Sequence, residues 1–342
     1  MKKAAVVILN WNGKHYLEDF LPSVVAFSLF ENTEVVVIDN GSTDDSIDFL
    51  KKEYDQQVRI VQLDANYGFT GGYNRGLQEV SAEYVVLLNS DVEVTPDWLS
   101  EPIKHLDEHP KTVACQPKIL SYQHRDIFEF AGACGGYIDT LGFPFCRGRI
   151  VSYLERDEAQ YDEVKSIFWA TGACLFIRLA DFLALGGFDE SFFAHMEEID
   201  LCWRIKSRGG EIVCVPQSAV YHLGGGTLNK ENPQKTYLNY RNNLLLLYKN
   251  ILPKDFCRVF FLRFFLDYAA AFIMLLQMKP KNSFAVIRAR IDYHKMRKGF
   301  QEKRKANIQA TKVLCIPEIY KNSILVDFFF KKKSKFSQLL FK

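Results

Sequence analysis

The first 120 residues alternate short apolar runs with segments whose apolar residues recur at helical spacing. β-branched runs that end in polar residues indicate buried strands, and the segments between them have the period of amphipathic helices. Strands are expected at residues 4–9, 33–38, 59–63, 84–88 and 113–116. Helices are expected at 15–29, from a capping box at Ser42 to about Tyr54, at 72–80, and from a first turn at Pro96. The alternation predicts an α/β fold with βαβ units and a mostly parallel central sheet flanked by helices.

The pattern loosens after residue 120 into Gly-rich and aromatic segments. A helix is expected at 197–208, a strand at 211–215 and a further helix at 233–252, before Pro253. Residues 256–278 form a strongly apolar stretch, and a basic tail follows.

Polar side chains stand where the expected strands end: Asn10, Asp39, Asn66 and Asp91 each follow a strand directly or closely. Ligands of parallel α/β sheets bind at the carboxyl ends of the strands. A dinucleotide-binding fold would need Gly-x-Gly-x-x-Gly after the first strand, and this chain has Asn-Trp-Asn-Gly there. The sequence therefore predicts a ligand site at the sheet edge and argues against a dehydrogenase.

Two segments near this edge have chemistry of their own. The turn Asn66-Tyr67-Gly68-Phe69-Thr70-Gly71-Gly72-Tyr73-Asn74 opens a helix and can bring backbone amides close to a ligand, although a purely structural turn explains it equally well. Asp91, in Asn89-Ser90-Asp91, is a hard oxygen ligand suited to Mg²⁺ or Mn²⁺ on a pyrophosphate; the alternative is a capping Asp before a turn.

Three carboxylates lie within an otherwise apolar segment, at Glu197, Glu198 and Asp200. Buried carboxylates are costly unless they are paired or used. Asp200 can pair with Arg204 one helical turn on, which leaves at least one glutamate as a general base. His222 follows a strand and precedes the Gly-rich residues 224–227, and beside an Asp ligand it becomes a candidate metal ligand rather than a structural His.

Charge and composition narrow the class of protein. Residues 279–342 contain 17 Lys and Arg against 4 Asp and Glu, a net charge of +13, which leaves −11 on the remainder of a chain whose total is +2. An acidic body argues against nucleic acid as a partner, and a basic tail indicates contact with an anionic surface. The apolar run at 4–9 is too short for a signal peptide, and the eight cysteines lack CxxC spacing, so a cytoplasmic body with buried free thiols is expected.

Five ordered motifs resemble those of family 2 glycosyltransferases, and more closely the bacterial rhamnosyltransferase-like branch. They are Val-Val-Ile-Leu-Asn-Trp-Asn-Gly, Val-Ile-Asp-Asn-Gly-Ser-Thr-Asp, Asn-Tyr-Gly-Phe-Thr-Gly-Gly-Tyr-Asn, Leu-Leu-Asn-Ser-Asp-Val and Met-Glu-Glu-Ile-Asp-Leu-Cys-Trp-Arg, and the match spans residues 4 to about 227. The resemblance implies the GT-A fold, a nucleoside-diphosphate sugar donor, a divalent cation (Mg²⁺ or Mn²⁺) and inversion at the anomeric carbon.

The resemblance also implies roles for individual residues. Asp39 would contact the base or ribose, with Asn10 lining that pocket; Asn66, Gly68 and Asn74 would belong to the donor site, and Trp169 would line the sugar pocket. Asp91 is the last acid of the DXD-like motif, whose first position is Asn89 here. With that carboxylate missing, His222 is expected to make up part of the coordination. Glu198 resembles the general base, and Glu197 is its alternative.

These expectations define a working hypothesis. Residues 1–227 form the catalytic domain (donor half about 1–118, acceptor half about 119–227), 228–255 a helical connection, and 256–342 an apolar helix with a basic tail. The enzyme transfers rhamnose or a hexose to a hydroxyl of a glycan or lipid-linked acceptor in cell-surface polysaccharide synthesis. The alternatives are an inactive sugar-nucleotide-binding scaffold and a processive synthase, but the chain lacks the several membrane spans and the Gln-x-x-Arg-Trp motif of such synthases.

The C-terminal part is expected to hold the enzyme on the inner face of the membrane. Residues 259–277 are nearly long enough to span, but Arg263 and Asp267 lie inside the segment, and each would cost roughly 2.5–3.5 kcal/mol at a bilayer centre. A helix lying in the interface is therefore favoured over a span. A buried core helix and a homodimer contact are the remaining alternatives.

Overall fold

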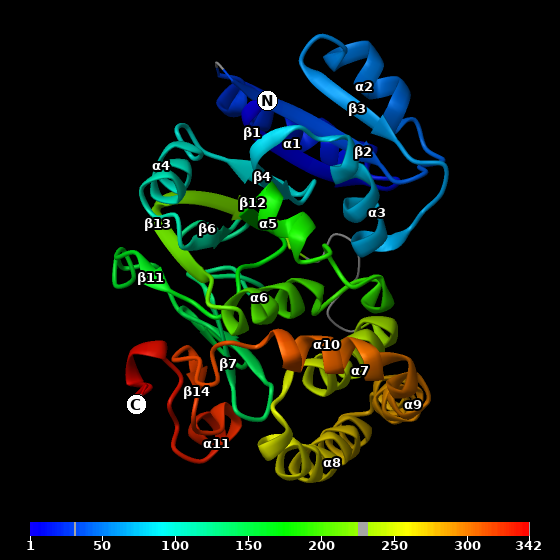
Figure 1. Ribbon diagram of the computed structural model, residues 1–342, viewed down its shortest axis with the longest axis vertical. Coiled ribbons are helices and arrows are strands. Elements are labelled where there is room, and N and C mark those ends of the chain that lie inside the picture. The colour runs from blue at the N-terminus through cyan, green and yellow to red at the C-terminus, as the bar shows by residue number, and fades with distance from the viewer. Residues whose placement is uncertain (31, 225–231, 342) are drawn as a thin grey trace.

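The computed structural model describes residues 1–30, 32–224 and 232–341 (Figure 1). Its centre is a nine-stranded sheet with the order β11-β13-β6-β12-β4-β1-β2-β3, and β5 pairs with β13. β12, β11 and β5 run antiparallel to their neighbours and the other pairings are parallel, so the sheet is mixed. The strands are β1 (Lys2–Asn10), β2 (Thr33–Asp39), β3 (Val58–Gln62), β4 (Ala82–Leu88), β5 (Val92–Val94), β6 (Thr112–Ser121), β11 (Lys165–Ser166), β12 (Cys174–Arg178) and β13 (Glu211–His222).

Both faces of the central strands β1, β2, β4 and β12 are buried, which explains why these strands are largely apolar. In β1, Ala4, Val6 and Ile8 belong to one core cluster, whereas Ala5 and Val7 belong to the other. The first cluster includes side chains of α1 (Lys14–Ser28), α2 (Ser46–Tyr54) and α4 (Ser100–Glu108). The second includes side chains of α3 (Gly68–Gly76, followed by η1, Leu77–Glu79), α5 (Leu179–Ala184) and α6 (Glu197–Ser207, preceded by η2, Glu190–Phe192).

A second sheet of five strands, which the sequence pattern did not predict, lies between the main sheet and the helical end of the molecule. Its order is β10 (Tyr153–Leu154), β9 (Arg149–Ile150), β8 (Pro144–Cys146), β7 (Gly136–Asp139) and β14 (Ile319–Tyr320). β14 comes from the C-terminal tail and pairs parallel with β7. Asp139 of β7 stabilises the position of the C-terminal tail, because its Oδ2 accepts from the backbone N–H of Ile324 at 2.9 Å.

The remaining helices form the end of the molecule opposite β2 and β3 (Figure 1). They are α7 (Pro233–Asn250), α8 (Pro253–Leu276), α9 (Pro280–Met296), η3 (Arg297–Phe300), α10 (Gln301–Ala310), α11 (Ile324–Phe329) and η4 (Phe336–Gln338). α7, α8 and α9 each begin with proline, whose missing N–H costs nothing in a first turn. The expected boundary at residue 227 and the loop before it fall in 225–231, outside the described residues.

α3 begins at Gly68 and not at Gly72, so that predicted start is too late. Two other predicted helix starts are too early. α2 begins at Ser46 and not at Ser42, because the Ser42 hydroxyl accepts from Asn10 Nδ2 at 3.2 Å and from the Asn12 N–H at 2.9 Å. α4 begins at Ser100, and Pro96 lies in the turn before it, where Asp97 has a φ of +58° that no helix continues. In the latter two cases polar residues that look like a helix start form a separate turn.

Arg263, Asp267 and Arg290 form a buried ion triad that attaches α8 to α9. Arg263 Nε lies 3.0 Å from Asp267 Oδ1, and Arg290 binds the other carboxylate oxygen; each side chain is at most 5% exposed. We expect Asp267→Asn to lower the free energy of unfolding by about 3–5 kcal/mol, because it leaves two buried guanidinium groups without their counter-charge. Urea denaturation measures the loss. Asp255→Asn, in an exposed pair on the same helix, is the matched control and should cost at most about 1 kcal/mol; equal losses would show that the triad does not attach α8.

Candidate active site

The carboxyl ends of β1 and β2 carry a buried polar cluster. Asn10 and Asp39 are paired in register, and Asn10 Nδ2 donates to Asp39 Oδ1 at 3.2 Å. Asp39 Oδ2 accepts from the Ser42 N–H at 3.0 Å, so its carboxylate is fixed from two sides. Asn10 Oδ1 is buried without a partner. The cluster therefore contains a carboxylate and an amide oxygen with unused acceptor capacity.

Asn40, the residue after Asp39, binds the Gly-rich turn and places it beside this cluster. Its Nδ2 donates to Asn66 Oδ1 at 3.1 Å and to the Gly68 carbonyl at 3.0 Å, and its Oδ1 accepts from the Tyr67 N–H at 3.0 Å. Gly68 has a φ of +70°, and a Cβ there would lie 2.6 Å from the Phe193 ring. Glycine is required at this position for both reasons.

Asp91 and His222 meet because β5 pairs antiparallel with β13, in a register that sets His222 opposite Val92. His222 Nε2 lies 3.2 Å from Asp91 Oδ1 and 3.5 Å from the Asn89 amide nitrogen. The sheet thus joins three of the predicted site residues, although His222 is 131 positions from Asp91 in the chain.

Glu129 is a third partner in this cluster that the sequence did not indicate. Its Oε1 lies 3.6 Å from His222 Nδ1, on the opposite side of the ring from Asp91. Burial disfavours the imidazolium, but the charges and hydrogen bonds of Glu129 and Asp91 outweigh it and raise the pKa of His222 to about 10. Burial would raise the pKa of Asp91, and His222 instead holds it below its ordinary value.

The donor set at this cluster fits a divalent cation that takes most of its ligands from the substrate. Within the described ranges, no group of three or more His, Cys, Asp or Glu side chains forms a complete metal site. Asp91 supplies one carboxylate and His222, once a bound cation has displaced its proton, one imidazole; Mg²⁺ or Mn²⁺ in phosphate-binding sites commonly has few protein ligands. A carboxylate on the far nitrogen, as Glu129 provides here, is the usual partner of a metal-binding His.

Glu197 and Glu198 open α6 after a segment with strained backbone. Phe193, His195 and Met196 have φ values of +67°, +69° and +73°. Burial raises the pKa of Glu198 to about 7; the residue as a whole is half-buried, and its Oε2 is buried without a partner. Glu197 is buried, and burial together with the Glu198 charge raises its pKa well above the ordinary value. A carboxyl with a pKa near neutrality is suited to proton transfer, which favours Glu198 over Glu197.

Asp200 has the structural role that its spacing predicted. Its Oδ2 lies 2.9 Å from Arg204 Nε and 2.8 Å from Lys249 Nζ, and its Oδ1 accepts from Asn250 Nδ2 at 2.9 Å. The side chain is fully buried. The predicted Asp200–Arg204 pair is therefore confirmed, and the contacts of Asp200 with Lys249 and Asn250 fix α6 to α7.

Glu129 and Glu198 both act electrostatically on the buried thiol of Cys146. Burial raises the pKa of Cys146, Arg149 opposes this rise, and the charges of Glu129 and Glu198 add to it. Tyr16 of α1 is a further residue near the cluster: after burial, the charge of Asp91 raises the pKa of its phenol. No pattern in the sequence distinguished Tyr16 or Glu129, because each contact joins distant segments.

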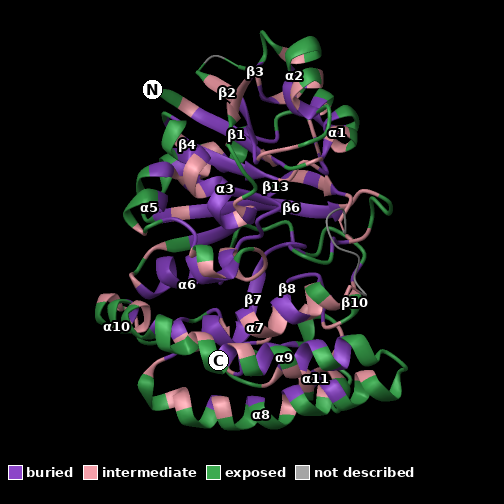
Figure 2. Ribbon diagram, turned by 90° about the vertical axis from the view of Figure 1, so that its right-hand side faces the viewer, coloured by how far each residue is buried: buried purple, intermediate pink, exposed green. Residues whose placement is uncertain are grey.

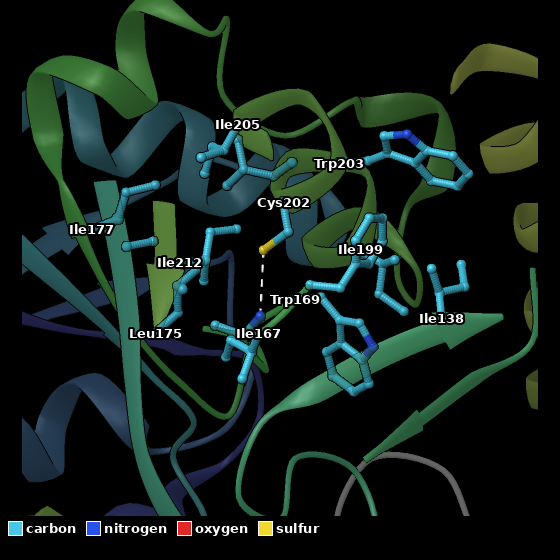
Figure 3. Packing of buried hydrophobic residues seen from close by; sticks show 14 of the residues in the cluster. Ile138, Ile167, Trp169, Leu175, Ile177, Ile199, Cys202, Trp203, Ile205 and Ile212 are labelled. Atoms are coloured by element: carbon cyan, nitrogen blue, oxygen red, sulfur yellow. Dashed lines mark hydrogen bonds between the residues drawn. The ribbon is translucent and has the colours of Figure 1, made fainter. Parts of the chain in front are cut away.

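Two predicted site residues have structural partners. Asn74 binds the backbone of Phe188 twice, donating to its carbonyl at 2.8 Å and accepting from its N–H at 2.9 Å. Trp169 is 3% exposed, and its Nε1 donates to the Tyr137 carbonyl at 2.9 Å. Figure 3 shows Trp169 among the buried side chains of the core, near Ile138 and Ile199. Contact of Asn74 and Trp169 with a sugar nucleotide stays a prediction.

Comparison with known proteins shows which family of enzymes this chain resembles. The model of glycosyl transferase family 2 matches residues 5–134. The chain is 27% identical over 258 residues to the N-acetylglucosaminyl-diphospho-decaprenol L-rhamnosyltransferase of Mycobacterium tuberculosis, covering 71% of this chain and 83% of that protein. It is 26% identical over 268 residues to an uncharacterized protein of Sinorhizobium fredii, covering 74% of this chain but 28% of that longer protein.

Among solved structures, GalNAc-T7 with UDP, GalNAc and Mn²⁺ superimposes with a TM-score of 0.58 at 17% identity, covering 94% of this chain and 59% of that one. This superposition and the family match give the GT-A fold of glycosyltransferases, as the sequence predicted. The part of the chain that matches the family 2 model is residues 5–134.

Proposed function

We propose that this chain transfers a sugar from a nucleoside-diphosphate donor to a hydroxyl acceptor with inversion at the anomeric carbon. The observation that supports it most directly is Glu198, whose carboxyl has a pKa of about 7 and an unpartnered Oε2 at the start of α6, in a chain that matches the family 2 model over residues 5–134. Rhamnose or a hexose is the expected sugar, since one relative is named as a rhamnosyltransferase.

In this proposal Glu198 accepts the proton of the acceptor hydroxyl, and the oxygen attacks the anomeric carbon opposite the diphosphate. The new C–O bond forms as the bond to the diphosphate oxygen breaks, and the nucleoside diphosphate leaves. Asp39 and the free Oδ1 of Asn10 bind the base or ribose, and Gly68 lets the turn after Asn66 approach the donor. Asp91 and His222 are the residues that would hold a divalent cation, which supplies Lewis-acid stabilisation of the leaving diphosphate.

The acceptor in this proposal is a glycan or a lipid-linked sugar of cell-envelope synthesis, met at the cytoplasmic face of the membrane. The M. tuberculosis relative is named for a lipid-linked substrate, and its likeness over 71% of this chain supports the same class of acceptor here.

Turnover of labelled donors tests the proposal. With Mg²⁺ or Mn²⁺ present, we expect release of nucleoside diphosphate from dTDP-rhamnose, tried first, or from UDP-hexoses. Donor binding without release, with acceptor extracts and with each cation, would favour the inactive scaffold instead.

A further inference from the structure

The helix α8 has its charged side chains facing the protein and its apolar side chains facing outward. Its buried residues are Val259, Arg263, Asp267 and Ala271, one per helical turn, so a single stripe contacts the body. Two of these four, Arg263 and Asp267, form the buried ion triad with Arg290 of α9. Arg263 also donates to the Leu141 carbonyl and to Asn243. The charges that argued against membrane contact are therefore satisfied inside the protein.

The opposite face of α8 is apolar and exposed along its length (Figure 2). Phe261, Phe265, Phe272 and Leu276 are 64%, 57%, 59% and 66% exposed. Among the described residues, α8 is the one helix long and apolar enough to cross a membrane by length and composition. Exposed apolar surfaces of this extent mark interaction sites.

A basic cavity opens beside the first turns of α8. It has a volume of about 450 Å³ and is lined by Phe256 of α8, Tyr248 of α7, and the cations Arg297, Lys298 and Arg304 of η3 and α10. Arg304 lies over the Tyr248 and Phe256 rings, 5.5 and 5.0 Å from their centroids. No acidic side chain in the described part of the chain lines this cavity, so it is suited to a phosphate group.

We propose that the outer face of α8 and this basic cavity form one docking surface for an anionic bilayer. α8 lies in the boundary between headgroups and acyl chains, and a lipid phosphate enters the cavity. The helix lies flat, over about 36 Å, because crossing the bilayer would pull Arg263 and Asp267 out of their buried pairs. A second copy of the chain is a poorer occupant, because both ends of the helix are positively charged. Lys254 and Arg258 outnumber Asp255 at one end, and Lys279 and Lys281 lie at the other, so like charges would meet in either orientation.

Sedimentation of the full chain with vesicles tests this surface. We expect binding to phosphatidylcholine vesicles that contain phosphatidylglycerol, weaker binding to phosphatidylcholine alone, and release by high salt or alkaline carbonate without detergent. Phe265→Glu combined with Phe272→Glu should weaken binding by about tenfold or more. Both side chains are exposed, so folding should be unaffected, and Phe30→Glu, at another exposed phenylalanine, is the matched control.

A second pair of variants tests the contribution of the basic cavity to vesicle binding. Arg297→Gln combined with Lys298→Gln should reduce the preference for anionic vesicles by about threefold to tenfold, whereas Lys51→Gln with Lys52→Gln removes the same charge from α2 and should not. A full chain that stays in the supernatant with anionic vesicles at low salt would overturn the proposal. So would release only by detergent, which indicates a span, or a dimer that the double glutamate variant dissociates. This inference uses the proposed function only for the choice of acceptor, and vesicle binding is measured without turnover, so either can fail alone.

A different observation assigns a role to Asn242 of α7. Its side chain is fully buried, and its Nδ2 donates to the carbonyls of Phe192, Ala194 and His195 at 3.0, 2.8 and 2.8 Å. Arg241 fixes the amide, because its Nε and Nη2 donate to Asn242 Oδ1 at 2.9 and 2.7 Å. The segment held in this way contains the left-handed residues Phe193 and His195 and leads directly into Glu197 and Glu198.

We infer that Asn242 is a positioning residue for the carboxyls of α6. The strained conformation persists only where its surroundings enforce it, and one amide supplies three of the enforcing contacts. The same segment reaches the donor side, since the Phe193 carbonyl accepts from the N–H groups of Phe69 and Thr70 at 3.0 and 3.3 Å. This inference rests on the proposed function of Glu198.

Steady-state kinetics and donor binding of three variants test it. Asn242→Ala should lower kcat by about 10–100-fold and displace the acid limb of the pH profile, and Asn242→Ser, which keeps one donor, should recover part of both. Asn243→Ala, one position along α7, removes a buried amide that donates to the Gly142 carbonyl at 2.7 Å and touches the segment only at Met196 Sδ, 3.9 Å away, so it should destabilise the fold while moving the pH profile much less than Asn242→Ala. An unchanged pH profile and kcat in Asn242→Ala would reduce Asn242 to a structural residue; no turnover by the unaltered chain would instead refute the proposed function.

Discussion

Replacing Glu198 by glutamine is expected to lower turnover by roughly 10²–10⁴-fold while donor affinity stays nearly unchanged, because the amide cannot accept the acceptor's proton. The unaltered enzyme should lose activity as pH falls through about 7, the value to which burial raises the pKa of Glu198, since the protonated acid is no base. Initial rates of donor turnover against pH, with donor affinity measured separately by calorimetry, check both statements.

Glu197 provides the comparison. Glu197→Gln should retain much more activity, because this side chain is buried and its pKa lies well above the ordinary value. Glu101→Gln, on the exposed side of α4, controls for loss of a charge. An inactive Glu197→Gln beside an active Glu198→Gln would move the catalytic base by one residue.

Replacing Asp91 by alanine is expected to abolish cation-dependent donor binding, because it removes the carboxylate from the cluster with His222. His222→Ala should weaken it by about 10–100-fold, and Glu129→Gln by about tenfold, since the glutamate acts through the imidazole. Titration of Mn²⁺ by electron paramagnetic resonance, with and without nucleoside diphosphate, measures these losses apart from activity.

Asp48→Ala removes an exposed carboxylate from α2 and is the matched control. Full activity of Asp91→Ala in the presence of chelator would remove the cation from the mechanism. Retained Mn²⁺ binding in His222→Ala would leave Asp91 as a ligand and give the histidine a structural role only.

The sequence by itself determined the donor half of the fold. Apolar runs with polar ends predicted β1, β2, β3 and β4 within a few residues, because strands buried on both faces must be continuously apolar. The polar residues at the ends of the strands also predicted that Asn10 and Asp39 meet at the sheet edge, since neighbouring parallel strands bring their carboxyl ends together. Ordered motifs predicted the GT-A class, which the family match and the fold confirm.

Only the tertiary structure decided the contacts between distant segments. Short strands such as β9, β10 and β14 carry too few residues for a periodicity, and pairing with neighbours alone defines them. Glu129 reaches His222, and Asn242 reaches the segment before Glu197, through packing of elements that no local pattern connects. The same holds for α8, whose composition indicated only an apolar helix. The direction in which Arg263 and Asp267 point depends on Arg290 of the next helix, because the ion pair with Arg290 turns them inward. The phenylalanines of α8 are then left on the outside.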